Sequence, residues 1–131
     1  MRILFLNERV DYSNATSYSL DLAPAIVERG HEVQLCTGGG ELIEEFRQRS
    51  IETYEASFNP LTMRKLLGYL ETFDPDLIHV QSLRSYPFGR KIMGRLRKPA
   101  VLTVHTRPGS RARPLREEYL CGAVAANEVI R

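Results

Sequence analysis

Asp74-Pro75-Asp76-Leu77-Ile78-His79-Val80-Gln81-Ser82 is the stretch of sequence that predicts the fold. Pro75 ends any preceding helix, because proline has no N–H and restricts the residue before it. The run from Leu77 to Val80 is apolar except for His79, and such a run is typical of a strand buried on both faces. Parallel sheets bind ligands beyond the carboxyl ends of their strands. The polar residues at this end are therefore candidate site residues: His79, Gln81, Ser82 and Arg84.

Similar runs on both sides of this stretch predict alternating strands and helices. Strands are expected over residues 2–7, 32–37, 51–56, 77–80, 100–105 and 123–130. Helices are expected over residues 41–50, 61–73 and 86–96, with an earlier helix ending at residue 29. The alternation predicts an α/β fold in which right-handed βαβ units form a doubly wound, mainly parallel, Rossmann-like sheet. The expected strand order is 3-2-1-4-5-6, with a crevice between strands one and four.

Two of the helices carry more detailed expectations. Pro24 deep inside a helix would cost about 3 kcal/mol, so the first helix is expected either to begin near Asp21 or to be kinked. Its candidate N-caps are Asn14, Thr16 and Ser17. The helix over residues 61–73 is amphipathic, and the residues expected to face inward are Leu61, Leu66, Leu67, Leu70 and Phe73.

The composition is that of one soluble globular domain. The chain has 131 residues, of which 43% are hydrophobic and 26% are charged. Charged residues follow Leu6 so closely that no secretory leader is expected, and no apolar run is long enough to span a bilayer. Cys36 and Cys121 lie outside any metal-ligand spacing and are expected to be reduced thiols. These features predict a cytoplasmic protein.

The net charge of +2 hides a division of the chain into an acidic and a basic half. Residues 1–76 carry seven basic and thirteen acidic side chains, whereas residues 77–131 carry eleven basic and three acidic ones. No acidic residue lies between Leu77 and Arg116. A basic half is either a solvated surface or the binding face for an anionic partner such as phosphate, nucleic acid or the inner face of a membrane.

Several well-known motifs are absent from the sequence. The turn after the first strand contains no glycine, so it lacks a dinucleotide-binding Gly-x-Gly-x-x-Gly, and Gly38-Gly39-Gly40 predicts only a flexible turn. There is no Walker A sequence, no Gly-x-Ser-x-Gly nucleophile motif and no good phosphoacceptor after the third strand. A three-histidine metal site is disfavoured because His31 lies near the opposite edge of the sheet. His79 has the pattern of a core histidine or a site residue, and His105, at a strand end, is the stronger site candidate.

Four segments, in order along the chain, resemble the GT-B glycosyltransferases of family 4. Residues 15–33 (ATSYSLDLAPAIVERGHEV) resemble the first helix and second strand of that family, and residues 74–82 resemble its fourth strand. Residues 98–106 resemble its fifth strand, and residues 120–131 resemble the segment that follows. The likeness covers nearly the whole chain.

The resemblance implies retaining transfer of a sugar from a nucleotide-sugar donor, with no metal and no other cofactor. It implies that this domain holds the acceptor, that a C-terminal domain holds most of the donor, and that His105 lies at the reaction centre. Residues expected near the donor phosphates are Ser13, Asn14 and Thr16. Residues expected near the acceptor, which is a carbohydrate, lipid or small molecule, are His79, Ser82, Arg84, Thr106 and Arg107.

The sequence departs from the family pattern at the donor side and at its end. Ser13-Asn14 stands where the family has Gly-Gly, Gln81 replaces a second histidine, and Thr106 replaces a glycine. The 131 residues are expected to form a single N-terminal domain, incomplete at its C-terminal end and without the donor-binding domain. Alone, they are expected not to catalyse transfer. A complementary C-terminal domain, or a second copy of the chain at an exposed apolar sheet edge, is the expected protein partner.

Two other functions remain open from the sequence. A non-catalytic Rossmann-like partner or regulatory module is favoured by the missing Gly-Gly and by Gln81. An anionic-lipid or nucleic-acid binder is favoured by the basic run between Arg84 and Arg116, and its affinity would fall steeply with salt concentration.

Overall fold

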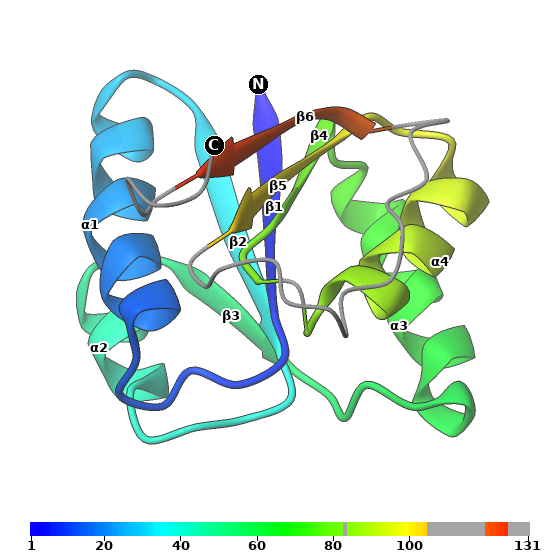
Figure 1. The fold of residues 1–131 in the computed structure, drawn as a ribbon, viewed down its shortest axis with the longest axis horizontal. Helices are drawn as coiled ribbons and strands as arrows, with labels where there is room; N and C mark the ends of the chain where they lie inside the picture. The colour runs from blue at the N-terminus through cyan, green and yellow to red at the C-terminus, as the bar shows by residue number, and fades with distance from the viewer. Residues whose placement is uncertain (83, 105–119, 126–131) are drawn as a thin grey trace.

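The computed structural model describes residues 1–82, 84–104 and 120–125, which form alternating strands and helices (Figure 1). The strands are β1 (Arg2–Asn7), β2 (Glu32–Thr37), β3 (Glu52–Glu55), β4 (Leu77–Val80), β5 (Ala100–Val104) and β6 (Leu120–Ala125). The helices are α1 (Asn14–Glu28), α2 (Ile43–Gln48), α3 (Pro60–Phe73) and α4 (Tyr86–Leu96). No helix in these ranges is both long and apolar enough to cross a membrane.

The strands form one parallel sheet in the order β3-β2-β1-β4-β5-β6, which confirms the predicted fold. β1 lies in the middle of the sheet, where Phe5 pairs with Leu35 of β2 on one side and with His79 of β4 on the other. From β1 to β3 each new strand is added on one side of the sheet, and from β4 onward each is added on the other side of β1. The switch point of the topology therefore lies between β1 and β4. That position is where open α/β sheets bind their ligands, beyond the carboxyl ends of the strands.

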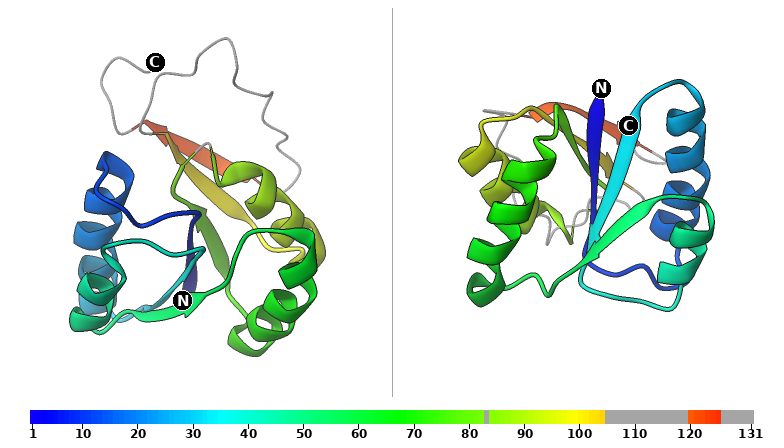
Figure 2. Two further views of the ribbon diagram at one scale, coloured as in Figure 1. Left: turned by 90° about the horizontal axis from the view of Figure 1, so that it is seen from below. Right: turned by 180° about the vertical axis from the view of Figure 1, so that it is seen from behind.

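Helices cover both faces of the sheet, with α1 and α2 on one face and α3 and α4 on the other (Figures 1 and 2). Successive strand residues point to opposite faces. On β1, Ile3 and Phe5 therefore join the core beneath α1 and α2, whereas Leu4 and Leu6 join the core beneath α3 and α4. Burial on both faces explains why the strands are apolar runs instead of alternating patterns.

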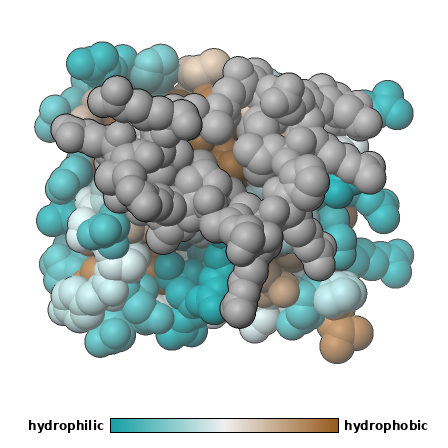
Figure 3. All heavy atoms as spheres, in the orientation of Figure 1, coloured by the Kyte–Doolittle hydropathy of each residue, from teal (hydrophilic) through white to brown (hydrophobic). Residues whose placement is uncertain are grey.

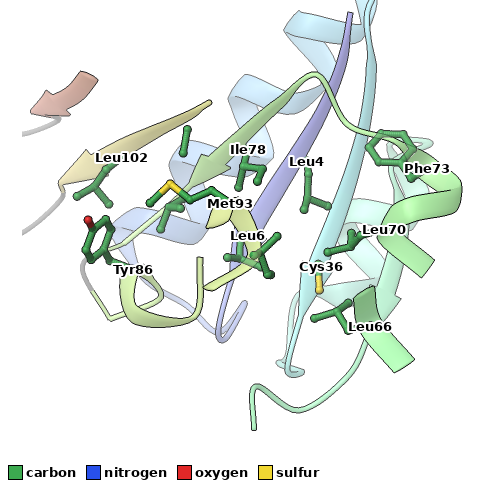
Figure 4. Close-up of a cluster of buried hydrophobic side chains, with 13 residues drawn as sticks. Leu4, Leu6, Cys36, Leu66, Leu70, Phe73, Ile78, Tyr86, Met93 and Leu102 are labelled. Atoms are coloured by element: carbon green, nitrogen blue, oxygen red, sulfur yellow. The ribbon is translucent and has the colours of Figure 1, made fainter. Parts of the chain in front are cut away.

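Helix α3 packs on the second of these cores. Leu66, Leu70 and Phe73 point from α3 toward Leu4 and Cys36 on the sheet (Figure 4). Leu61, by contrast, is 92% exposed, so the expectation that it faces inward was wrong. Leu61 and Leu70 are nine positions apart, which at about 100° per residue places them on opposite sides of the helix.

Helix α1 begins earlier than expected. Its N-cap is Ser13, whose Oγ accepts a hydrogen bond from the Thr16 N–H at 3.1 Å, and the helix runs from Asn14 through Pro24 to Glu28. The start near Asp21 and the three candidate N-caps were therefore wrong. The missing N–H of Pro24 leaves the Leu20 carbonyl without its helical donor, and the Arg49 guanidinium donates to that carbonyl instead, at 3.3 Å. This replacement bond lets the helix continue past the proline.

The last strand also differs from its expected position. β6 spans Leu120–Ala125, not residues 123–130, and pairs with β5 from Ala100↔Leu120 to Val104↔Ala125. The pairing contains a register shift between Ala100 and Val101. Because Ala100 pairs with Leu120, the strand starts before the segment that the sequence pattern marked.

Candidate functional site

The residues expected near the donor phosphates lie where β1 leads into α1. The Ser13 hydroxyl caps the helix by accepting from the Thr16 N–H, and its oxygen is also 3.1 Å from Thr16 Oγ1. Thr16 is buried, whereas Asn14 is exposed. The N–H groups of Asn14 and Ala15 bond to nothing in the described part of the chain. Free N–H groups at the positive end of a helix favour an anion.

A buried polar seam, formed by Asn7, Ser19 and Gln81, joins α1 to the two central strands. The Ser19 hydroxyl lies 3.0 Å from Gln81 Oε1 and 2.9 Å from the Ala15 carbonyl, and Asn7 Nδ2 donates to the Ser19 oxygen at 3.5 Å. Gln81 is 0% exposed. Its Nε2 has no hydrogen-bond partner among the residues that the structure describes. An unpaired buried amide of this kind is destabilising.

His79 lies in the core, not at the open edge of the sheet. Its Nε2 is 2.6 Å from Thr103 Oγ1 on β5, and the residue is 8% exposed. Its ring meets Phe5 edge-on at a centroid distance of 5.1 Å and Tyr18 of α1 at 6.5 Å. The contacts join β1, β4, β5 and α1, so they favour the core-histidine interpretation over direct contact with a ligand.

Ser82 and Arg84 belong to the turn between β4 and α4. The Ser82 hydroxyl accepts from the Ser85 N–H at 3.2 Å, and the buried Ser85 hydroxyl accepts from the Glu8 N–H at 2.8 Å. The Arg84 side chain is 83% exposed, and its Nε lies 3.7 Å from Glu8 Oε2. These contacts fasten the turn after β4 to the segment after β1. The crevice edge is therefore built from both segments.

A pocket of about 210 Å³ opens beside this turn, between the starts of α3 and α4. We call it the α3–α4 pocket; its lining residues are Glu8, Phe58, Asn59, Pro60, Met63, Arg84, Pro87, Phe88 and Lys91. Of the sequence-predicted site residues that the structure describes, only Arg84 lines it. The pocket combines apolar surface with both signs of charge.

The segment after β1 is held firmly by the loop after β2. Val10 donates to the Gly39 carbonyl at 2.9 Å and accepts from the Leu42 N–H at 3.0 Å. A Cβ atom at Gly40 would lie 2.6–2.8 Å from the Val10 backbone, so only glycine fits there. Asp11 accepts from the Arg9 guanidinium and from the Glu41 N–H, and these bonds lower the pKa of its carboxyl. The glycine run is thus a closely packed support.

The structure brings some predicted site residues together and leaves others apart. Ser13 and Thr16 contact each other at the start of α1, and Ser82 and Arg84 share the turn after β4. His79 lies deeper in the sheet. His105, Thr106 and Arg107 fall outside the described residues. Across the described ranges, no three His, Cys, Asp or Glu side chains gather closely enough to hold a metal ion.

Sequence reasoning missed Glu8, Ser19, Ser85 and the aromatic residues of the α3–α4 pocket. One signal was available for Ser19, because it is a polar residue that shares the buried stripe of α1 with Leu20 and Ala23. Ser85 and Phe58 lie in loops, where local pattern does not encode contacts across 77 or 30 residues of chain. On the face shown in Figure 3, the described surface is mostly hydrophilic, with only scattered hydrophobic areas.

Comparison with known families gives one match along most of the chain. Residues 15–126 match the family profile described as Glycosyltransferase Family 4. No curated protein matches the sequence significantly.

Solved structures with a similar fold include a protein described as a glycosyltransferase and a protein in complex with a nucleotide sugar. Anabaena Alr3699/HepE in complex with UDP-glucose has a TM-score of 0.69 and 19% identity, over 83% of this chain and 30% of that chain. CalG4, the calicheamicin glycosyltransferase, has a TM-score of 0.61 and 18% identity, over 86% and 34%. MurG of Acinetobacter baumannii has a TM-score of 0.66 and 12% identity, over 88% and 43%. At these identities the likeness concerns the fold, and the chain spans less than half of each structure.

Proposed function

Because the chain belongs to glycosyltransferase family 4, we propose that these 131 residues form the acceptor-side half of a retaining transferase that uses a nucleotide-sugar donor without a metal. One observation carries the proposal. The start of α1, where the N–H groups of Asn14 and Ala15 have no partner among the described residues, lies at the same carboxyl edge of the sheet as the α3–α4 pocket. An anion-binding position and a ligand pocket at one edge of the sheet suit transfer from a nucleotide sugar to an acceptor.

Each predicted site residue takes a role in this proposal. Asn14 presents backbone N–H to a donor phosphate, while Ser13 and Thr16 hold the helix end in place. Arg84 and Ser82 form the acceptor side, with Ser82 acting through the turn that it stabilises. His79 positions β4 against β5 through its contact with Thr103.

The roles of His105, Thr106 and Arg107 rest on the family resemblance alone. His105 is proposed for the reaction centre, and Thr106 and Arg107 for the acceptor side. We further propose that these 131 residues are inactive by themselves, since they span 30% of Alr3699/HepE and 34% of CalG4. Activity should appear only when a donor-binding domain is supplied.

The donor position can be tested by titrating the 131-residue chain with UDP-glucose and GDP-mannose and recording amide chemical shifts. We expect shifts at Asn14 and Ala15, lost in Asn14→Asp because a carboxylate there repels the donor phosphates. Gln48→Glu makes the same amide-to-carboxylate change at an exposed position of α2 and should leave binding intact. Binding that survives Asn14→Asp would rule out the α1 site.

A second candidate function is a non-catalytic partner module. It is favoured by Ser13, whose hydroxyl occupies the Thr16 N–H that an approaching anion could otherwise use. In that case His105→Ala would leave the cellular function unharmed. Loss of function in His105→Ala, with folding unchanged by circular dichroism, would favour the transferase.

A further inference from the structure

We propose that the α3–α4 pocket binds an acceptor that carries a phosphate directly beside an apolar segment. This inference rests on the proposed function and specifies its substrate class. The pocket volume of about 210 Å³ corresponds to about seven groups of water size, which suits a phosphate and a short apolar segment. The bulk of a longer acceptor would extend outside.

The apolar part of the pocket is rigidly built. Phe58 and Phe88 stack face to face with a centroid distance of 4.2 Å and an angle of 7° between the rings. Both rings and Met63 are partly buried and pack against the core beneath α3 and α4. Pro60 and Pro87 add further apolar lining at the first turns of the two helices. A surface fixed in this way binds an apolar group with little loss of side-chain entropy.

The charged part of the pocket has an excess of positive charge. Glu8 and Arg84 form an ion pair at 3.7 Å, so their charges offset each other. Lys91 also lines the pocket and pairs with no carboxylate within the part of the chain that the structure describes. Among the described lining residues, one cation therefore remains for a ligand, and a phosphate can also compete with Glu8 for the Arg84 guanidinium.

Two helix starts reinforce this charge. Both α3 and α4 begin at the pocket, and the positive end of a helix dipole favours an anion. The Ser85 side chain makes no capping bond to α4, because its hydroxyl instead accepts from the Glu8 N–H. The N-terminal N–H groups of α4 therefore receive no hydrogen-bond acceptor from the N-cap side chain, and a bound phosphate could accept from them. An uncharged apolar ligand would gain nothing from these features.

The proposal is tested by titrating the 131-residue chain with geranyl phosphate, geraniol and inorganic phosphate, following amide shifts around Phe88 and Lys91. We expect geranyl phosphate to bind at least tenfold more tightly than either of the others. Lys91→Gln should weaken its binding about tenfold, whereas Arg95→Gln, which removes an exposed charge from the same helix outside the pocket, should not. Met63→Gln should weaken the binding of geranyl phosphate and leave the weak binding of inorganic phosphate unchanged.

Two results would overturn the inference. Equal binding of geraniol and geranyl phosphate would show that charge plays no part, and equal losses in Lys91→Gln and Arg95→Gln would show that only the general basic surface is involved.

The source of the phosphate, a membrane lipid or a soluble molecule, is resolved with phosphatidylcholine vesicles containing phosphatidic acid. Sedimentation that depends on Lys91 supports a lipid acceptor, and geranyl phosphate binding without sedimentation supports a soluble one.

The outcome is separable from that of the donor titration. Geranyl phosphate binding without any response to UDP-glucose or GDP-mannose would retain the pocket and refute the donor position. A donor response at Asn14 without geranyl phosphate binding would refute the pocket assignment and retain the transferase proposal.

Discussion

Arg49 allows a proline to sit inside α1. Its guanidinium donates a hydrogen bond to the Leu20 carbonyl, which Pro24 cannot do because it has no N–H. Arg49→Met should therefore lower the free energy of unfolding by about 1 kcal/mol. In a Pro24→Ala background, residue 24 regains its N–H and the carbonyl has a helical donor. The effect of Arg49→Met should then shrink, as measured by urea unfolding of the four proteins of the cycle. Equal losses in both backgrounds would contradict this account.

Cys36 should be chemically inert in the folded protein. It is fully buried among apolar side chains, and burial raises the pKa of its thiol from 9.0 to about 12. Because the pKa is raised on folding, the associated stability is present below pH 9 and is lost as the pH rises toward 12.

In a Cys121→Ser chain, Cys36 should react with a thiol reagent at pH 8 only as fast as the protein unfolds. The reagent is an aromatic disulfide that forms a mixed disulfide with the cysteine and releases one aromatic thiolate, whose absorbance is followed. The chain unfolded in urea is the reactive control. Rapid native-state labelling would show that the thiol is accessible.

Single residues also mark the limit of prediction from sequence. His79 interrupts an apolar run, so both of its interpretations were visible from the sequence. Its contacts with Thr103, Phe5 and Tyr18 in the structure favour the core role. Glu8 looked like an ordinary loop residue. Its importance comes from Ser85 and Arg84, which are 77 and 76 positions away in the chain, and no local pattern carries such a contact.

Helix α4 approaches the sheet closely at Gly89. A Cβ atom there would lie 2.7 Å from Val80 Cγ2 and 3.0 Å from Leu6 Cδ2. Gly89→Ala should therefore destabilise the protein by about 1–3 kcal/mol through overpacking. Gly94 is the matched control, since no atom lies within 4 Å of its added Cβ, and Gly94→Ala should stabilise by up to about 1 kcal/mol through helix propensity. Thermal unfolding of both variants measures the contrast, and similar signs at the two positions would refute it.

The polar seam between α1 and β4 lowers the stability of the protein, because Gln81 Nε2 is buried without a hydrogen-bond partner among the described residues. Gln81→Met keeps the volume of the side chain and removes the unpaired Nε2, while the Ser19 hydroxyl can still donate to the Ala15 carbonyl. We expect the free energy of unfolding to stay level or to rise by about 1 kcal/mol in chemical denaturation. A loss greater than that would mean that the amide has a bonding partner in solution.

The bounds of a helix or strand agreed with the prediction where the residues that fix them lie within the segment itself. The ranges of β1, β2, β4 and α4 agree with the pattern, because apolar runs and turn residues lie within each segment. The start of α1 did not, because the helix continues through Pro24 with the help of Arg49, which follows α2 in the chain. β6 was misplaced because its extent depends on pairing with β5.

Across the whole molecule, protection of the backbone should follow the position of each strand in the sheet. β1 is paired on both sides and buried on both faces, whereas β3 is paired only with β2. In hydrogen exchange at neutral pH, we expect the amides of β1 and β4 to exchange slowest and those of β3 to exchange much faster. Uniform protection of β1 and β3 would indicate that only global unfolding exposes the sheet.

The topology was predictable as a whole, because alternating strands and helices with right-handed crossovers leave few arrangements. The place of Ser13, Asn14 and Thr16 between the first strand and its helix was predictable for the same reason, whereas their role at the donor stays a prediction. The α3–α4 pocket was not predictable, because Phe58 and Phe88 meet only once two separate βα loops are placed.

The two faces of the sheet have separate cores, and this separation bears on how such a domain can diversify. The proposed donor position belongs to α1 and the core beneath it, whereas the α3–α4 pocket belongs to the other core. Phe58, Met63 and Phe88 of the pocket pack against the core that contains Leu6 and Val80, whereas Phe5 and Leu35 belong to the other core. A lineage could thus exchange one acceptor for another through changes on a single face, while the opposite face continues to handle the same donor.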